Sequence, residues 1–509
     1  MPARTATRLQ QIQISDFLGG LNLRSSEVEL ATNETPDCMN ITLDERGGVV
    51  KRLGLERFGN ALSTGATALY YSGALDDFFI QDGSALKKTD NFTSLTTVNT
   101  FTTSARCAMV DFNGLLVVVH PVDGVYTYNG SAFTNRSTTV KGDAIASWQN
   151  KVWVGGDTSK KARVWWSNAG DATTWTYTAG PPEVGDFIDL REVDDQIITG
   201  LGIGQDMDVV GRPGLLVTKE HSFYRINNST TGAYTTLGTE AGASSHLAIA
   251  SIGGLTATLN RHGIWVTNGT GAPLLASSRL TPLFTAAQLS LADMTKCSAG
   301  TIGDRIIFSI PRTGSSRPDL TLEYHPRDGW IVPHSFGLNA YTVFTKADDI
   351  LVGAGTLNGS NFYAFKVFKS GADDGQAIES RYQTRWYEFA GENRAMLRRL
   401  MISGRGSFDM YVRKDFSVGV GDLFQVLSQS SDAEWNAFNW NDANWGPSMY
   451  EEQFELYSLG HARAFSFRLE HTGTTSAQTV PLLGDGATTE VGGFAFYSAL
   501  ADFVNLGAN

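Results

Sequence analysis

The sequence has few cysteines and no grouping of side chains that is typical of a metal centre. Its three cysteines, Cys38, Cys107 and Cys297, lie far apart, and no C-x-x-C motif or cysteine and histidine cluster connects them. Zinc and similar ions need several such ligands, usually at short spacing in at least part of the set. The sequence therefore predicts buried free thiols, no metal and no other cofactor.

Motifs that carry catalysis are also lacking. There is no GxxxxGK[ST], HExxH or G-x-S-x-G, and the glycines of GLGIG, residues 200–204, lack dinucleotide-binding spacing and are expected in a loop. The segment SNAGDATTW, residues 167–175, approximates the aspartate box of sialidase propellers, but Gly170 precedes Asp171. That box is a hairpin turn outside the sialidase active site. We predict a protein that is not an enzyme and keep a glycan-cleaving propeller as an alternative.

Long apolar runs and excess basic charge are absent as well. No run of about 18 apolar residues occurs, and the N-terminus lacks the apolar segment of a signal peptide, so we expect no membrane span and synthesis in the cytoplasm. The net charge of −12 argues against a groove that grips nucleic acid phosphates. DNA that passes without tight binding is compatible with this charge.

What is abundant is glycine, at 54 residues, together with turn-forming side chains. Between residues 65 and 372, about seven units of short strands and turns recur at irregular spacing. One unit, residues 107–134, has turns at Asn113-Gly114, Asp123-Gly124 and Asn129-Gly130. This pattern predicts a β-propeller-like domain, with a large barrel or sandwich as the alternative. Four aromatic residues on its strands are expected to be buried: Trp153, Trp165, Trp265 and Phe308.

The regions before and after this repeated pattern differ from it in sequence. Residues 1–64 contain short extended pieces between glycines, with room for one short helix near residues 33–39, and hold too little apolar sequence for a core. We expect an extended N-terminal arm that lies on the propeller or on a neighbour. Residues 373–509 predict a C-terminal β-sandwich, which makes the whole chain all-β. A loop of this sandwich contains Trp435, Trp440 and Trp445. We expect these tryptophans either to pack on the sandwich or to contact a partner.

The opening DFLGGLNLRSSEVELATNETPDCMNITLDERGGVVKRLGLERFG contains a phrase of the type F-x-G-G-L-N, then N-E, then N-x-x-L-D-x-x-G-x-x-K-R-x-G. This phrase resembles the start of tail hub and nozzle proteins of podovirus-like tailed bacteriophages, in which it introduces a propeller. The matching residues are Phe17, Gly19, Gly20, Leu21, Asn22, Asn33, Glu34, Asn40, Leu43, Asp44, Gly47, Lys51, Arg52 and Gly54.

The resemblance implies a structural protein of the virion tail, assembled as a hexameric ring below the portal and adaptor and forming part of the DNA ejection channel. Its expected partners are further copies of itself, the adaptor or portal, tail fibre or spike proteins, and genomic DNA in passage. A tail-tip or baseplate protein and a receptor- or glycan-binding propeller are the alternatives. The candidate assembly contacts are Phe17, Gly19, Gly20, Leu21, Asn22, Lys51, Arg52, Trp435, Trp440 and Trp445.

Overall fold

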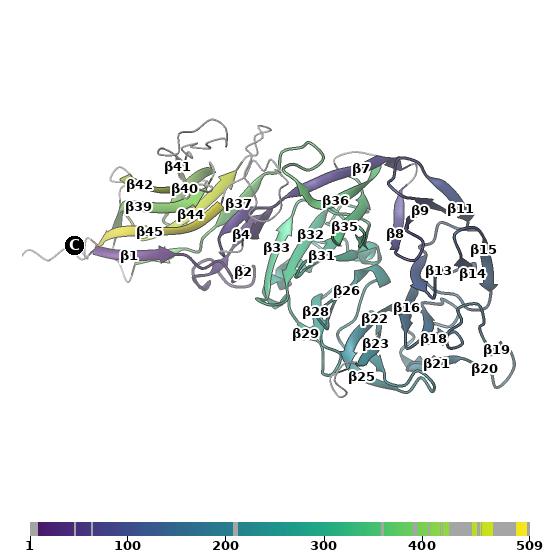
Figure 1. The fold of residues 1–509 in the computed structure, drawn as a ribbon. Coiled ribbons are helices and arrows are strands. Elements are labelled where there is room, and N and C mark those ends of the chain that lie inside the picture. Colours follow the sequence, from purple (N-terminus) through teal and green to yellow (C-terminus); the bar gives the residue numbers. More distant parts are fainter. Residues whose placement is uncertain are drawn as a thin grey trace, which may run out of the picture. The chain divides into compact units, whose positions relative to one another are not determined.

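The structure is a computed structural model, and it describes most of the chain as strands (Figure 1). The described residues are 9–44, 47–62, 65–206, 212–357, 361–389, 394–405, 408–417, 419, 421–426, 450–455, 459, 461–471 and 495–505. The chain divides into two compact units. The first comprises Met1–Glu56, Asp328–His334 and Phe368–Asn509, and the second comprises Arg57–Arg327 and Ser335–Val367.

The second unit consists of seven successive antiparallel sheets. Sheets one to three contain β8 (Ala66–Ser72), β9 (Asp77–Asp82), β10 (Ala85–Thr89) and β11 (Thr96–Thr100); β12 (Ala108–Phe112), β13 (Leu115–His120), β14 (Gly124–Tyr128) and β15 (Phe133–Ser137); and β16 (Ala144–Trp148), β17 (Lys151–Gly155), β18 (Arg163–Trp166) and β21 (Phe187–Asp189). The third sheet carries an additional hairpin, β19 (Tyr177–Thr178) and β20 (Val184–Gly185).

The remaining sheets continue this order along the chain. They contain β22 (Ile198–Asp206), β23 (Arg212–Lys219), β24 (Phe223–Ile226) and β25 (Tyr234–Gly238); β26 (Ile249–Ile252), β27 (Leu255–Asn260), β28 (Gly263–Thr267) and β29 (Leu274–Leu275); β30 (Ser298–Ile302), β31 (Arg305–Ile310), β32 (Leu320–His325) and β33 (Trp330–His334); and β34 (Ala340–Phe344), β35 (Ile350–Gly355), β36 (Phe362–Ser370) and β7 (Gly54–Leu62). Short 3₁₀ turns are η1 (Glu192–Asp194), η2 (His246–Ala248), η3 (Ser278–Leu283) and η4 (Leu291–Lys296).

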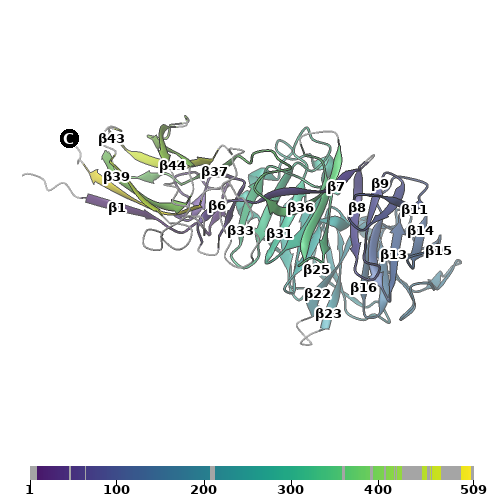
Figure 2. The ribbon, with the colours of Figure 1, turned by 45° about the horizontal axis from the view of Figure 1, so that its top comes forward.

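These sheets are arranged as the blades of a closed ring. The first strands of the blades, β8, β12, β16, β22, β26, β30 and β34, each contact the next, and β34 contacts β8. The strand β7 precedes blade 1 in the sequence but joins β36 as the outer strand of blade 7 (Figure 2). The unit is therefore a β-propeller of seven blades, which confirms the predicted fold class.

Side chains of alternate strand positions fill the spaces between neighbouring blades. On β18 of blade 3, Trp166 clusters with Leu215 and Tyr224 of blade 4, whereas its neighbour Trp165 clusters with Val117 of blade 2. This alternation follows from the two-residue period of a strand. The prediction of buried aromatic residues is confirmed for Trp153, Trp165 and Phe308, but Trp265 is only partly buried.

Two glycine positions explain local features of the blades. Asn113 and Gly114 have φ angles of +49° and +77°, which are the two left-handed positions of a tight hairpin turn. Gly200 lies on the strand β22, so the expected loop is wrong there. A Cβ at Gly200 would lie 2.2 Å from Cδ1 of Ile249, so glycine permits the close approach of β22 to blade 5.

The first unit is a β-sandwich. Its seven-stranded sheet has the order β42 (Tyr450–Glu455), β39 (Ala395–Arg405), β45 (Ala495–Asn505), β6 (Val49–Lys51) and β5 (Ile41–Leu43), with β1 (Leu9–Ile14) on β45 and β43 (His461–Ala462) on β39. Its six-stranded sheet has the order β4 (Asp37–Met39), β37 (Ser380–Gln383), β44 (Ala464–His471), β40 (Phe408–Lys414) and β41 (Asp422–Val426), with β38 (Tyr387–Glu388) on β44. The parallel pair β2 (Gly20–Leu21) and β3 (Glu34–Thr35) also belongs to this unit.

The structure corrects the predicted division of the chain at residues 64 and 372. Residues 1–56 belong with the C-terminal residues in one unit, because β1 and β6 pair with β45 and β4 pairs with β37. The short helix expected near residues 33–39 is also wrong, since this segment forms β3 and β4. The strands β1, β4 and β6 are too short to fold alone, and each pairs with a strand more than 300 residues away, which leaves no local sequence signal for that pairing.

Candidate assembly site

Phe17 and Leu21, two of the predicted assembly contacts, are buried in the first unit. The centre of the Phe17 ring lies 5.5 Å from the ring centres of both Tyr382 and Phe496. Tyr382 belongs to the six-stranded sheet and Phe496 to the seven-stranded sheet. Phe17 therefore packs between the two sheets as part of the sandwich core.

Gly19 and Gly20 permit close backbone contact at the parallel pair β2 and β3. The amide of Gly19 donates to the carbonyl oxygen of Asn33 at 3.0 Å, and a Cβ at Gly19 would lie 2.5 Å from that oxygen. Gly20 has a φ of +66°, which side chains rarely adopt. The double glycine is therefore required by local geometry.

Asn22 and Glu34 form a buried polar link across the same pair. Asn22 Nδ2 donates to Glu34 Oε2 at 2.9 Å, while Asn22 Oδ1 accepts from the amides of Arg24 and Ser25. Glu34 Oε2 also accepts from the amide of Ala31 at 3.0 Å. Burial of these groups is tolerated because each has partners.

Lys51 and Arg52 stand where the N-terminal segment meets the C-terminal strands of the unit. The Arg52 guanidinium binds both carboxylate oxygens of Asp373, and its Nε donates to Asn40 Oδ1 at 3.0 Å. Burial and, second, the neighbouring Arg52 charge lower the pKa of Lys51 to about 8. The phrase residues Asn40 and Arg52 thus hold distant segments of one chain together.

The described candidates accordingly contact their own unit, and their burial leaves them little surface for a partner. Their role as contacts between proteins stays a prediction. Trp435, Trp440 and Trp445 lie outside the described residues, so their placement is not addressed.

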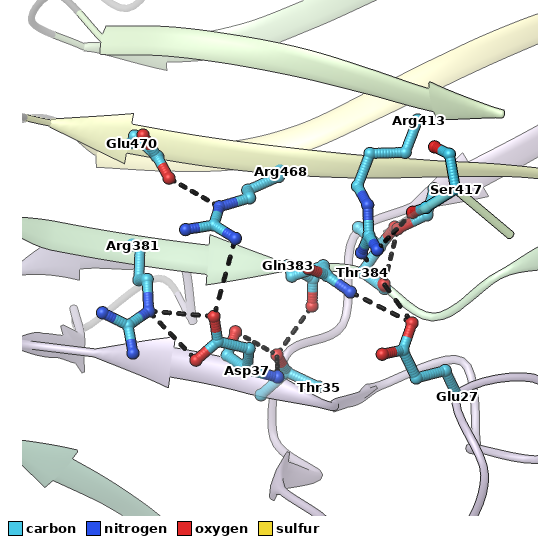
Figure 3. A network of polar contacts seen from close by, with 11 residues as sticks. Glu27, Thr35, Asp37, Arg381, Gln383, Thr384, Arg413, Ser417, Arg468 and Glu470 are labelled. Carbon is cyan, nitrogen blue, oxygen red and sulfur yellow. Dashed lines mark hydrogen bonds and ion pairs between the residues drawn. The ribbon is translucent and has the colours of Figure 1, made fainter. Parts of the chain in front are cut away.

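The sequence did not reveal a partly exposed polar network beside these residues, which we call the polar seam (Figure 3). In its first half, Arg381 Nε donates to the two carboxylate oxygens of Asp37 at 3.0 and 2.9 Å, and Arg468 Nε donates to Glu470 Oε1 at 2.5 Å. Arg468 Nη1 lies 3.9 Å from Asp37 Oδ2. These charges from β4, β37 and β44 connect three adjacent strands.

The second half of the polar seam is centred on Glu27. Its Oε2 accepts from Trp386 Nε1 at 2.6 Å and from Gln383 Nε2 at 3.3 Å, and it lies 3.8 Å from Nη1 of Arg413 (Figure 3). The Arg413 guanidinium also lies 5.0 Å from the centre of the Trp386 ring. The side chains of Arg381, Asp37 and Glu27 in the seam are 39%, 35% and 43% exposed. Its residues carry no local pattern, because they are brought together only by long-range strand pairing.

The enzyme-like segment at residues 167–175 is a closed turn. Asp171 Oδ1 accepts from the amide and hydroxyl of Thr173, and these hydrogen bonds hold the pKa of Asp171 below its usual value. The carboxylate of Asp171 is therefore engaged in hydrogen bonds within the turn. Within the described part of the chain, no cluster of three metal-ligating side chains occurs and no helix is long and apolar enough to cross a membrane.

Comparisons with known proteins give a fold likeness only. No family model and no curated protein matches the chain. Among solved structures it is similar to BBS1N in complex with ARL6DN, at 12% identity over 62% of this chain and 97% of that chain, with a TM-score of 0.40. It is similar to the computationally designed Ika8 protein, at 12% identity over 62% and 100%, with a TM-score of 0.37. The extracellular domain of the putative one-component system BT4673 from B. thetaiotaomicron matches at 9% identity over 78% of this chain and 58% of that chain, with a TM-score of 0.42.

Proposed function

We propose that this chain is a structural component of a tailed-bacteriophage tail, a hub or nozzle subunit that surrounds the DNA ejection path. The observation that carries the proposal is the opening phrase shared with those proteins. Its residues Asn22, Glu34, Asn40 and Arg52 form buried hydrogen bonds that tie the N-terminal segment into a sandwich. These hydrogen bonds explain why a chain with this fold would contain the residues of the opening phrase.

We expect DNA to pass between several copies of this chain and not along the axis of a single propeller. The Arg106 side chain of blade 2 donates to the carbonyl oxygen of Thr295, next to blade 6, at 3.2 Å. These blades lie on opposite sides of the ring, so the side chain crosses the axis. DNA would then pass through a ring of subunits, for which a closed cyclic assembly is the usual solution.

Charge and surface chemistry are consistent with a conduit. The chain carries −12 net charge, which disfavours tight contacts with phosphates. The polar seam offers paired charges of both signs, as expected of a contact that fixes the register between proteins. The hexamer, the adaptor and the fibre or spike are the partners proposed from the resemblance.

A glycan-binding or glycan-cleaving propeller is the alternative, but no feature of the residues that the structure describes favours it. Glycosidases need a pair of carboxyl groups facing a cleft. The carboxylate of the box-like segment, Asp171, is instead bonded to Thr173 and Thr174.

The test is the particle formed by the purified full chain, alone and with the adaptor protein of the same phage. Negative-stain microscopy and mass measurement should give a ring, alone or on the adaptor. Arg381→Glu, which reverses a charge in the polar seam, should weaken this assembly more than Arg312→Glu, which alters an exposed pair with Asp319 on the propeller. A chain that neither forms rings nor joins the adaptor would overturn the proposal.

A further inference from the structure

Two histidines from neighbouring blades lie next to each other on the surface of the propeller. His221 is in the turn between β23 and β24 of blade 4, and His262 is in the turn between β27 and β28 of blade 5. The centres of their imidazole rings are 5.6 Å apart, and the ring planes are inclined at 46°. The sequence did not indicate this pair, because the two residues are brought together only by the packing of blade 4 against blade 5.

Hydrogen bonds join the two turns, so the fold sets the distance between the histidines. Asn260 Nδ2 donates to the carbonyl oxygen of Glu220 at 3.2 Å, and Arg261 Nε donates to Glu220 Oε1 at 2.6 Å. The amide of His262 donates to Asn260 Oδ1 at 2.9 Å. These contacts hold together the backbone segments that carry the two histidines.

Both imidazoles are accessible to the solvent. The His221 side chain is 33% exposed, and His262 is exposed as well. Within the part of the chain that the structure describes, neither ring makes a hydrogen bond, and Glu220 Oε2 lies 3.9 Å from His221 Nε2, beyond hydrogen-bond distance. The positive charge of Arg261 is paired with the same carboxylate. The ring nitrogens are therefore available to a ligand.

Two imidazoles at this separation are suited to binding one transition-metal ion. Histidine has an ordinary pKa of about 6.5, so the neutral form that binds metals predominates at about pH 7.5. A metal–nitrogen distance of about 2.0–2.1 Å places the centres of two imidazoles on one ion roughly 5 Å apart. The observed 5.6 Å is close to this value, and a small rotation of the two exposed side chains closes the difference.

We infer that His221 and His262 together bind a divalent transition-metal ion of the copper, nickel and zinc group. Imidazole favours these ions, whereas magnesium and calcium prefer oxygen ligands. One nitrogen of each ring would hold the ion, and water molecules would complete its coordination. The site has two protein ligands, so it differs from the clusters of three that do not occur among the described residues. The inference does not depend on a role in a phage tail.

The test uses the full-length chain without a histidine tag and measures the heat of binding of zinc chloride in a buffer that does not bind metals. We expect saturable binding of one ion per chain and no saturable binding of magnesium chloride at the same concentrations. Copper(II) should bind more tightly than zinc, and its electron paramagnetic resonance spectrum should show splitting by nitrogen ligands. No saturable binding of zinc or copper, or equal binding of magnesium, would overturn the inference.

Variants distinguish the paired site from binding to single histidines. His221→Ala and His262→Ala should each weaken zinc binding roughly 10-fold or more, because the second imidazole no longer binds at the high effective concentration that the fold provides. His461→Ala removes an exposed histidine of the first unit and should bind zinc as the native chain does. Unchanged binding in both His221→Ala and His262→Ala, or an equal loss in His461→Ala, would overturn the inference.

A second measurement keeps the test valid if a variant folds poorly. The thermal transition of the metal-free propeller reports folding, and His221→Gln and His262→Gln replace any alanine variant that lowers it. Zinc should raise this transition in the native chain, because the ion bridges two blades and binds the folded chain more tightly than the unfolded one. The increase should be lost in the folded single variants, and an increase of the same size in them would contradict the paired site.

Discussion

Arg52 and Asp373, 321 residues apart in the sequence, form a bidentate ion pair with Nη1 2.8 Å from Oδ1 and Nη2 2.5 Å from Oδ2. The guanidinium is 1% exposed and the carboxyl group 12%. Removing one partner leaves the other charge buried, which typically costs about 3–5 kcal/mol. We expect Asp373→Asn to lower the unfolding free energy of the first unit by about this amount, measured by urea denaturation.

The matched control for this pair is Arg381 and Asp37, whose side chains are 39% and 35% exposed. An accessible pair contributes less than about 1 kcal/mol. Asp37→Asn should therefore have a small effect on the same transition. Equal losses in the two variants would show that burial is not what makes the Arg52 pair important.

The second prediction concerns the strand β7, which belongs to the propeller although it precedes blade 1. Deleting residues 1–53 should disrupt the sandwich, whose sheets lose β1, β4, β5 and β6, but should leave the propeller transition near its original temperature. Deleting residues 1–64 also removes β7 and opens blade 7, so the propeller should melt at a lower temperature. Calorimetry distinguishes the two truncations, and identical propeller transitions would contradict a closing role for β7.

The third prediction compares two tryptophans of the propeller. Trp153 is fully buried, whereas Trp265 is partly exposed and donates from Nε1 to Asn260. Trp153→Ala should cost about 3–5 kcal/mol, as expected for a large buried aromatic residue, and Trp265→Ala should cost distinctly less. Denaturant unfolding of the second unit measures both, and a greater loss at Trp265 would contradict the observed packing.

Local chemistry made the blades predictable from the sequence, but not the pairing of distant segments. The pair Asn113-Gly114 predicts a hairpin turn because few residue pairs readily adopt two consecutive left-handed conformations. Nothing near Arg52 indicates Asp373, and nothing near Arg106 indicates Thr295, since both contacts depend on how the ring and sandwich close. The sequence placed the residues of the opening phrase among the assembly contacts, and it gave no sign that Phe17 and Leu21 are buried in the sandwich, because burial is a property of the assembled sheets.

The fourth prediction is a pH dependence at His246. Burial lowers the pKa of this imidazole in the folded chain to about 4, whereas the unfolded value is about 6.5. Between these values the unfolded chain binds the proton and the folded chain does not, so stability falls as the pH falls. From pH 7 to pH 5 the native chain should lose up to about 2 kcal/mol more than His246→Gln.

Asp143 titrates with the opposite sign, since its folded pKa is raised to about 6 and its contribution to stability is lost as pH rises through that value. It is present in both proteins, so its contribution largely cancels from the comparison. Denaturant curves of the propeller at the two pH values provide the measurement. Parallel pH profiles would show that His246 is not held neutral by its surroundings.

The last prediction concerns DNA. A subunit of an ejection conduit should let a duplex pass, and each charge on the inner wall of a hexamer would recur six times. A basic ring would therefore hold the phosphates, while an acidic or neutral ring would not. With −12 net charge, the isolated chain should show no measurable duplex binding at about 0.15 M salt, where the Debye length is about 8 Å and only close cationic contacts contribute. Phage particles without the protein should leak packaged DNA or fail to infect. Submicromolar duplex affinity in a fluorescence anisotropy titration would contradict the conduit and indicate a protein that grips DNA. Such affinity requires a patch of lysine and arginine side chains that releases counterions from the DNA.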